Sequence, residues 1–565
     1  MELVILNQTY TEWLWQKPIT KEVDKDIFTN PSQHHLFHGD IYDDITEELI
    51  TPSPFRTKKD IPCILDYKGS THGRSKDKLF YRCIPDNKTL PQFLVAYQPK
   101  TTGFDKNKVN KYVLIQFKEW SADEKHPIGT LTNTIGDVDN YDAYSEYQLY
   151  SKGLVISLKE FIKETLFLKN KKVQDDLIDA ICEQYPTIEN KTHLNIFSID
   201  PEGCVDIDDA IGIVEHKDHT VISIYIANVP LILDHFNLWP HLSDVCSTIY
   251  LPTHKRPMLP SILSDNMCSL LKDELRFAFV MDVMHSSSGL LSLPTFKPVL
   301  IKVSKNYVYE EADLLGNTDY QQLLKLTQSV DNKIIDSHDL VEHYMIYMNS
   351  QSALKLSEYN CGIFRSAHIK EKEEEKEEEK EKLNSLPSAI TTFITNWKYA
   401  SGQYCTFDTK SSHDLVGKGV YVYTHITSPI RRLVDVINMA LLQDKLGLVK
   451  YKNISVKQFS VWTSESKVDF INTTMKNIKK VQNNCNLLAL YIKNKESRKK
   501  QSFTGYIVDV SKKTYHTYNV YVPEYKMMST FKSNELMEPY SSRQFTLHLF
   551  MDEANLKQKI RLQLV

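Results

Sequence analysis

Residues 193–229 read HLNIFSIDPEGCVDIDDAIGIVEHKDHTVISIYIANV, and this stretch decides the fold of the chain's central part. Its apolar segments predict strands over His193–Ile199, Ala210–Glu215 and Val221–Val229. The polar turn at His216–His219 is short enough to join two antiparallel strands directly. We therefore expect an antiparallel sheet whose first two strands are separated by an acidic loop.

That loop carries four aspartates: Asp200, Asp206, Asp208 and Asp209. Asp206 and Asp208 stand two apart, so an extended backbone points both to one face, and a proline and a glycine between Asp200 and Asp206 allow a turn that brings Asp200 to the same space. Carboxylates held this close repel one another unless a cation lies among them, and oxygen ligands suit Mg²⁺ or Mn²⁺. An exposed acidic turn explains the spacing equally well, whereas the register of an EF-hand calcium loop is not matched.

A second segment, TSPIRR at residues 427–432, precedes the amphipathic sequence LVDVINMALLQDKLG. Ser428 is a suitable N-cap, Pro429 suits the first helical position, and Gly447 is expected to end the helix. A helix N-terminus with two arginines in its first turn would bind an anion. The alternative is a structural helix in which Arg431 pairs with Asp435 at i, i+4.

The composition is that of a globular protein with several domains. The chain has 565 residues, of which 41% are hydrophobic, and its length predicts about three or four domains. No stretch approaches about 18 consecutive apolar residues, so no membrane span is expected. Nine scattered cysteines without paired spacing favour neither a disulfide framework nor a zinc module, and indicate a reducing intracellular compartment, cytoplasmic or nuclear.

The formal net charge of −4 conceals a strong separation of sign. Residues 451–565 carry 19 Lys/Arg and 9 Asp/Glu, a net of +10, so the preceding 450 residues carry −14. The low-complexity run KEKEEEKEEEKEK at residues 370–382 supplies −3 of that and is interpreted as a passive, solvated insertion. The basic C-terminal part, which includes KNKESRKK at residues 493–500, favours a polyanionic partner.

Patterning along the chain predicts an α+β protein in which a central region of strands and helices lies between strand-rich ends. Alternation over Lys111–Trp120 predicts a strand, helical periodicity appears over 144–184, and long helices are expected over 334–358 and 429–446. The last 65 residues return to strands, over 503–510, 517–522, 545–550 and 560–565. A short all-β terminus with a basic lead-in is typical of OB folds that bind single-stranded nucleic acid.

Together the two motifs resemble the RNase II/RNase R family, the RNB exoribonucleases. The family's pattern of aspartates is matched at 200, 206, 208 and 209. Tyr-Leu-Pro at 250–252, Met-Leu-Pro at 258–260 and Leu-Ser-x-Asn-x-Cys-Ser-Leu at 263–270 follow in the family's order. YTHITSPIRR at 423–432 looks most like the eukaryotic, exosome-associated branch.

The resemblance implies four domains and a function. The expected domains are a degenerate cold-shock/OB-like domain at 1–98, a second cold-shock/OB domain with linker helices at 99–190, an RNB catalytic domain at 191–495, and a C-terminal OB-like domain at 496–565. The implied function is processive 3′→5′ hydrolysis of single-stranded RNA to nucleoside 5′-monophosphates, with Mg²⁺, or Mn²⁺ in its place, as cofactor. The chain is expected to act as a monomer, and the resemblance is also compatible with an exosome-like complex.

The resemblance also assigns roles to single residues. Asp200, Asp206, Asp208 and Asp209 would be metal ligands, and Asp208 and Arg431 would be the catalytic pair, with Arg431 holding the scissile phosphate. The residues implied to contact the substrate are Tyr250, Tyr309, Glu342, Arg431 and Arg432. The alternatives are a core tyrosine for Tyr250, a solvated helix residue for Glu342, and a structural role for Tyr309.

The sequence departs from the family pattern at several places. The stretch between Tyr309 and Glu342 is shorter than usual, so a second aromatic clamp is not assigned. The family's Ile-Ala-Asp-Val reads Asn at 228, the second glutamate of Val-Glu-Glu is His343, and Met439-Ala440 replaces a His-Arg pair. These differences leave an alternative open, an RNA-binding protein with a catalytically impaired RNB domain. No room is left for the N-terminal endonuclease domain of some eukaryotic relatives.

Overall fold

The computed structural model describes residues 1–24, 29–98, 108–242, 244–286, 292–369, 377–407, 422–496, 502–510, 517–553 and 556–565. The chain divides into two compact units. Unit 1 comprises residues 1–155, 251–253 and 477–565, and unit 2 comprises residues 156–250 and 254–476. None of the helices in the described part of the chain is both long and apolar enough to cross a membrane.

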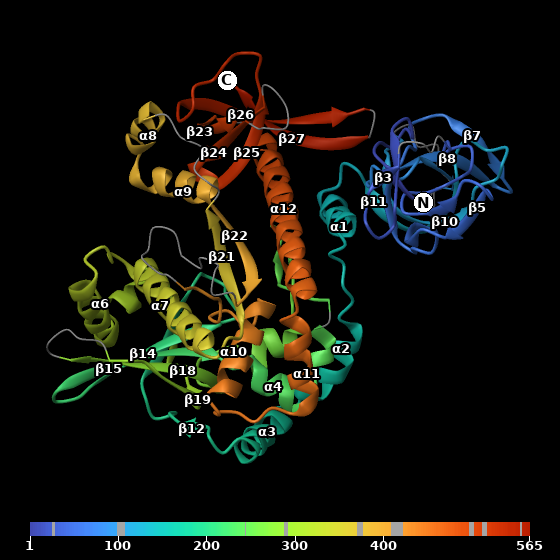
Figure 1. Cartoon of the computed structure of the whole chain (residues 1–565). Coiled ribbons are helices and arrows are strands. Elements are labelled where there is room, and N and C mark those ends of the chain that lie inside the picture. Colours follow the sequence, from blue (N-terminus) through green and yellow to red (C-terminus); the bar gives the residue numbers. More distant parts are fainter. Residues whose placement is uncertain are drawn as a thin grey trace. The chain divides into compact units, whose positions relative to one another are not determined.

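Unit 2 is built on a seven-stranded sheet in the order β12-β19-β18-β15-β14-β13-β20 (Figure 1). The predicted antiparallel arrangement is confirmed, because β13, β14, β15, β18 and β19 pair antiparallel with their successive neighbours, and only β12 and β20 join in parallel. The strands of unit 2 are β12 (Glu189–Asn190), β13 (Ile196–Asp200), β14 (Asp209–Glu215), β15 (His219–Ala227), β16 (Ile249–Tyr250), β17 (Lys255–Arg256), β18 (Leu275–Ser286), β19 (Thr295–Lys302), β20 (Lys305–Val308), β21 (Ile363–Ile369) and β22 (Ala400–Thr406).

The central strand β15 is buried on both faces, from Ile222 through Ala227. A strand covered on both sides reads as a continuous apolar run rather than as an alternation, which explains the sequence ISIYIA. In the view of Figure 1, α6 and α7 lie above β14, β15 and β18. Both faces of the sheet therefore supply the core of the unit, and the acidic loop leaves this core at the end of β13.

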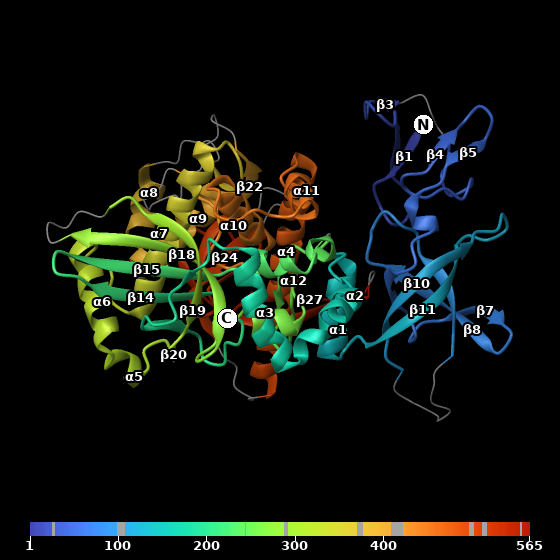
Figure 2. The same cartoon turned by 90° about the horizontal axis from the view of Figure 1, so that it is seen from below.

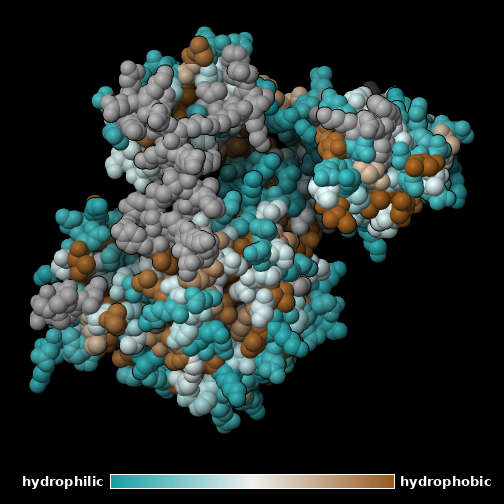
Figure 3. Space-filling model, in the orientation of Figure 1, coloured by the Kyte–Doolittle hydropathy of each residue, from teal (hydrophilic) through white to brown (hydrophobic). Residues whose placement is uncertain are grey.

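Several helices of unit 2 pack on this sheet, whereas α8 and α9 lie beside the separate β21–β22 hairpin. On the face shown in Figure 3, hydrophobic residues of the unit are scattered among hydrophilic ones, as expected when the apolar side chains lie inside. The helices are α2 (Lys159–Thr165), α3 (Lys171–Gln184), α4 (Val229–His235), α5 (Ala312–Leu315), α6 (Thr318–Val330), α7 (Ser337–Glu358), α8 (Glu377–Asn384), α9 (Ser388–Tyr399), α10 (Leu433–Lys445) and α11 (Asn453–Trp462), with short 3₁₀ or π turns η2 (Leu166–Lys169), η3 (Trp239–Leu242) and η4 (Leu263–Met267). Residues 370–376 of the acidic run lie outside the described residues, and α8 begins directly after them.

The start of α10 corrects one prediction. The helix begins at Leu433, and its N-cap is Arg432 in an extended conformation, so Ser428 and Pro429 are not its N-cap and first residue. The carbonyl of Ser428 instead accepts from the backbone N–H groups of Arg431 and Arg432, which closes a turn before the helix. Arg432 also bridges Ser247, and this pairing holds its backbone extended. The predicted stop is confirmed by Gly447, whose φ of +67° suits glycine.

Unit 1 contains two N-terminal sheets, whose strands are seen in Figure 2. One has the order β3-β2-β1-β4-β5, and the other has the order β6-β10-β11-β9-β8-β7, in which β6 also pairs with β8. That extra pairing closes five strands into a barrel, the architecture expected of an OB fold. The strands are β1 (Glu2–Ile5), β2 (Trp13–Gln16), β3 (Val23–Asp24), β4 (Ile41–Asp43), β5 (Glu48–Thr51), β6 (Ile61–Leu65), β7 (Thr71–Ser75), β8 (Lys78–Pro85), β9 (Phe93–Tyr97), β10 (Lys111–Glu119) and β11 (Ile128–Asp137), with η1 (Pro54–Arg56) before β6. Residue 98, an expected domain boundary, lies between β9 and β10 of the barrel.

The C-terminal part of unit 1 is an antiparallel sheet in the order β25-β24-β23-β26-β27. The predicted strands over 503–510 and 517–522 are confirmed residue for residue. The elements are β23 (Phe503–Val510), β24 (Thr517–Val522), η5 (Pro523–Tyr525), β25 (Met527–Lys532), β26 (Ser542–Asp552) and β27 (Lys557–Leu564), preceded by α1 (Tyr141–Ser151) and by α12 (Glu465–Glu496), which contributes residues to both units. Residues 497–500 of the basic run lie outside the described residues.

Candidate functional site

The acidic loop begins at the last residue of β13. Asp200 accepts a hydrogen bond from Ser198 Oγ at 2.7 Å. The chain then turns at Gly203, whose φ of +76° is unstrained only for glycine. Burial raises the pKa of Asp200 to about 6, and the charge of Asp206 adds to the rise, which places the two carboxylates near each other. The approach of Asp200 to the other aspartates as a shared set of ligands stays a prediction.

Ser269, which belongs to the matched motif at 263–270 but was given no role there, fixes the middle of the loop. Its Oγ accepts from the backbone N–H of Ile207 at 3.0 Å and donates to the carbonyl of Val205 at 2.8 Å. The backbone N–H of Leu270 donates to the Ile207 carbonyl at 3.0 Å. Because these hydrogen bonds lie on both sides of Asp206, they fix the backbone that carries its carboxylate.

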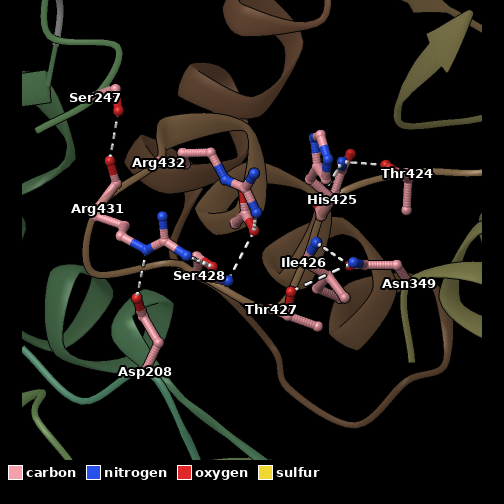
Figure 4. A network of polar contacts seen from close by, with 12 residues as sticks. Asp208, Ser247, Asn349, Thr424, His425, Ile426, Thr427, Ser428, Arg431 and Arg432 are labelled. Atoms are coloured by element: carbon pink, nitrogen blue, oxygen red, sulfur yellow. Dashed lines mark hydrogen bonds and ion pairs between the residues drawn. The ribbon is translucent and has the colours of Figure 1, made fainter. Parts of the chain in front are cut away.

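Asp208 lies at the centre of the site. It is 5% exposed, and it accepts from the backbone N–H of Ile430 at 2.8 Å and from Arg431 Nε at 3.2 Å. Figure 4 shows Arg431 reaching from the turn before α10 toward Asp208. Burial raises the pKa of Asp208 to about 7, although Arg431 and the Ile430 N–H both favour the charged form. The two motifs singled out in the sequence thus meet at one carboxylate.

The turn that carries Arg431 is anchored on both sides. Arg431 Nη2 donates to Ser428 Oγ at 2.9 Å, and the Arg431 carbonyl accepts from Ser247 Oγ at 2.8 Å and from Thr248 N–H at 2.9 Å. The side chain of Arg431 nevertheless remains 44% exposed. Its guanidinium is therefore positioned by the protein while one edge stays open to solvent, as an anion-binding arginine requires.

Arg432 is engaged differently. Its Nη2 donates to Asp435 Oδ1 at 2.9 Å, and its Nε pairs with Asp435 Oδ2 at 2.8 Å. Asp435 is fully buried and also accepts from the backbone N–H of Ser428 at 2.8 Å. The alternative pairing of Arg431 with Asp435 is wrong, because Arg432 takes that partner and Arg431 pairs with Asp208. A substrate contact for Arg432 stays a prediction.

Asp206 is held by the hairpin of β16 and β17. Tyr250 Oη donates to Asp206 Oδ2 at 2.8 Å, and Lys255 Nζ donates to Asp206 Oδ1 at 3.1 Å. Tyr250 and Lys255 are directly paired across the hairpin. Tyr250 is 40% exposed, so the alternative of a core tyrosine is wrong. Lys255 carried no motif signal beyond its place between the two Leu-Pro motifs, and sequence reasoning missed it.

Asp209 and Tyr309 lie on the other side of the loop. Burial, together with the charges of Asp200 and Asp208, raises the pKa of Asp209 well above its ordinary range. Burial raises the pKa of Tyr309 as well, and Asp209 and Asp200 contribute to that rise. The Tyr309 ring stacks on His338, with 3.8 Å between centroids and 7° between planes. The backbone N–H of Tyr309 donates to the Asp200 carbonyl at 3.3 Å, so Tyr309 lies beside the acidic loop, and its contact with RNA stays a prediction.

The remaining predicted positions lie in the helices. Glu342 is exposed on α7, and the contacts that assemble the acidic loop come from other elements. Asn228 is buried and exchanges amide hydrogen bonds with Gln443 of α10, at 3.0 and 3.1 Å. Met439 and Ala440 are fully buried on the same helix. Two of the family departures therefore serve packing between α10 and its neighbours.

Two buried asparagines support the segment that leads to Arg431. Asn349 of α7 accepts from the Ile426 N–H at 2.8 Å and donates to Thr427 Oγ1 at 3.3 Å. Asn438 of α10 accepts from the Ile363 N–H at 2.8 Å and donates to the His425 carbonyl at 3.1 Å. Figure 4 shows this network beside the turn of Arg431. These asparagines were missed, because nothing in their local sequence distinguishes them from helix-surface residues.

The donor set fits a hard divalent cation in its chemistry. Carboxylate oxygens are the ligands that a hard divalent cation prefers, and burial together with the charges of neighbouring carboxylates raises the pKa of Asp200 and Asp209, which a cation would counteract. Across the part of the chain that the structure describes, no three His, Cys, Asp or Glu side chains are arranged to hold a metal ion. Asp206 is turned to Lys255 and Asp208 to Arg431, so protein cations contact two of the four predicted ligands.

Comparisons with known proteins match two domain families. The RNB domain matches residues 188–332 and 318–447, and the Dis3-like cold-shock domain 2 (CSD2) matches residues 80–151. The probable exosome complex exonuclease RRP44 of Caenorhabditis elegans is 24% identical over 412 residues, which cover 59% of this chain and 42% of that protein. Ribonuclease R of Chlamydia pneumoniae is 25% identical over 392 residues, which cover 57% of this chain and 55% of that protein. The chain thus spans about half the length of these relatives.

Solved structures show the same fold. The apo form of Mycoplasma genitalium RNase R superposes with a TM-score of 0.66 at 15% identity over the whole of both chains. Yeast Ssd1, described as a pseudonuclease, has a TM-score of 0.56 at 13% identity and covers 97% of this chain and 73% of its own. At such identities the likeness concerns the fold, which both nucleases and a pseudonuclease share.

Proposed function

This chain belongs to the RNB family, and from that membership we propose that it is an exoribonuclease that shortens single-stranded RNA processively from the 3′ end. Its products would be nucleoside 5′-monophosphates. The observation that carries the proposal is the contact of Asp208 with Arg431 and with the Ile430 N–H, which lie 223 and 222 residues away in the chain. Phosphodiester hydrolysis needs positive charge at the phosphate beside a carboxylate, and this contact supplies both.

Arg431 would bind the scissile phosphate. Its guanidinium is held at Nε by Asp208 and at Nη2 by Ser428, which leaves its open edge for a phosphate oxygen. Asp208 would keep that arginine in place, and the Ile430 N–H would keep Asp208 in place. A preorganised cation is effective here because little reorganisation is needed when charge develops on the phosphate.

Asp200, Asp206, Asp208 and Asp209 would hold Mg²⁺ or Mn²⁺, which when bound supplies charge neutralisation and an activated water. The tyrosines would grip the RNA: Tyr250 has an exposed ring, and Tyr309 extends a stack with His338. Stacking of bases on aromatic rings is tolerant of sequence, which suits degradation of any strand. Contacts of Glu342 and Arg432 with the substrate belong to the same proposal, as do a monomeric enzyme and an exosome-like partner.

A second candidate is an RNA-binding protein with an impaired RNB domain. Two observations favour it. Lys255 and Arg431 contact two of the four predicted metal ligands, and His343 stands where the family has its second glutamate. Binding without cleavage would distinguish this candidate from the enzyme.

The test uses the full chain with RNA labelled at either end. Because the proposed reaction is processive, a 5′-labelled single strand incubated with Mg²⁺ is expected to give a short labelled end product with few intermediates, whereas a 3′-labelled strand gives labelled mononucleotide at once. EDTA should abolish both products, and a 3′-phosphate block should slow them. Tight binding of RNA with no product in Mg²⁺ or Mn²⁺ would overturn the nuclease and support the second candidate.

A further inference from the structure

Lys255 lies between two carboxylates of unit 2. Its Nζ is 3.1 Å from Asp206 Oδ1 and 3.0 Å from Asp265 Oδ1. Asp265 is itself fixed, because Ser264 Oγ donates to the same Oδ1 at 2.7 Å. The three side chains are 10–28% exposed, so water screens their charges only in part. The ammonium therefore interacts strongly with both acids.

Both oxygens of Asp206 have partners from one hairpin, but the two partners differ in kind. Tyr250 donates a neutral hydrogen bond to Oδ2, and Lys255 donates a charged one to Oδ1. Each carboxylate oxygen can accept more than one partner, so neither bond by itself excludes a further ligand. What opposes a cation on Asp206 is the positive charge of Lys255, whereas Tyr250 only orients the carboxylate.

We propose that Lys255 is a positioning residue that gives up its contact with Asp206 and keeps its contact with Asp265 when a divalent cation binds at Asp206. The inference rests on the proposed function, since it takes Asp206 as a metal ligand. Asp265 gives the displaced ammonium a second partner a short distance away, so the side chain stays at the site. Lys255 thereby sets the affinity of Asp206 for the cation. Asp265 lowers the free energy needed to displace the Lys255 ammonium from Asp206.

This account predicts opposite effects for two substitutions. Lys255→Met removes the competing charge, so the dissociation constant for Mn²⁺ should fall about tenfold. Asp265→Asn removes the acceptor that the displaced ammonium needs, so the dissociation constant should rise about tenfold. In the double variant the second substitution has no ammonium to act on, and its affinity should equal that of Lys255→Met. Lys255→Arg keeps the charge and should stay within about twofold of the wild type.

The measurement is titration of the full chain with Mn²⁺ alone, followed by the loss of the free-ion signal in electron paramagnetic resonance. Lys217→Met is the matched control, because it removes one exposed lysine from the turn after β14, about 20 Å along the strand from Asp209. Thermal unfolding of each variant checks that the fold is kept. An affinity of Lys255→Met equal to or weaker than that of the wild type overturns the inference and leaves the proposed function standing. Absence of Mn²⁺ binding in wild type and variants overturns both.

Discussion

Replacement of Asp435 by asparagine should loosen the turn that positions Arg431. Asp435 is fully buried, accepts from Ser428 N–H at 2.8 Å, and pairs with Arg432 at 2.8 and 2.9 Å. Asparagine keeps the shape of the side chain but leaves the guanidinium of Arg432 without a counter-charge. Breaking one side of a buried ion pair costs about 3–5 kcal/mol, and because Arg432 is 20% exposed we expect the lower end, about 3 kcal/mol.

The assay is native-state hydrogen exchange of peptides from α10, because a chain of two units does not unfold in one step. A loss of about 3 kcal/mol corresponds to exchange about 100-fold faster. Asp444→Asn is the control on the same helix: its carboxylate faces Lys445 at 3.7 Å near the surface, and its loss should change the free energy of opening by less than about 0.5 kcal/mol. Equal exchange in the two variants would refute the reasoning that the Arg432–Asp435 pair stabilises this turn.

Three further predictions concern the same segment. Arg431→Lys keeps the charge but cannot bind Asp208 and Ser428 together, so kcat/KM on labelled single-stranded RNA should fall at least about tenfold, with an unchanged melting temperature; an unchanged rate would count against the phosphate role of Arg431. Asn349→Leu leaves the buried Ile426 N–H without its acceptor, so native-state hydrogen exchange of peptides covering residues 422–432 should show a loss of about 2 kcal/mol, and a neutral result would contradict the role given to that asparagine. Burial holds the pKa of His425 well below its usual value, so below about pH 6.5 the unfolded state binds a proton that the folded state does not. The free energy of unfolding should therefore fall by up to about 1.4 kcal/mol per pH unit from about pH 6.5 downward, until the pKa of His425 in the folded state is reached. Thermal unfolding of His425→Gln should show a weaker pH dependence than that of the wild type.

The fold of unit 2 could be predicted where it depends on the hydrophobic pattern and turn residues of segments that are adjacent in the sequence. The apolar run of β15 and the acidic loop beside it are adjacent in sequence, and their arrangement follows from periodicity and from the turn residues between them. The C-terminal strands were predicted for the same reason. The start of α10 was not, because the carbonyl of Ser428 closes a turn and Arg432 bridges Ser247, 185 residues earlier in the chain.

The site shows the same limit. The spacing of the aspartates and the two arginines marked the right segments, since charge patterns are readable in one dimension. The residues that bind each of these groups could not be predicted, because they are distant in the sequence: Lys255 lies 49 residues from Asp206, and Asn349 lies 77 residues from Ile426. The turn at residues 428–432 decides which arginine binds Asp208 and which binds Asp435. That turn is fixed by contacts from residues 247–248 before β16, from α7 and from the loop after β13.

The most direct test of the central claim compares Asp208→Asn with Asp218→Asn. Asp208 is buried against Arg431, and Asp218 is exposed in the turn between β14 and β15. The rate of nucleotide release from 3′-labelled single-stranded RNA in Mg²⁺ is the measurement. The account predicts a loss of at least about 100-fold for Asp208→Asn, with RNA binding retained, and an unchanged rate for Asp218→Asn. Equal rates in the two variants would contradict the assignment of the acidic loop and Arg431 as the site of RNA cleavage.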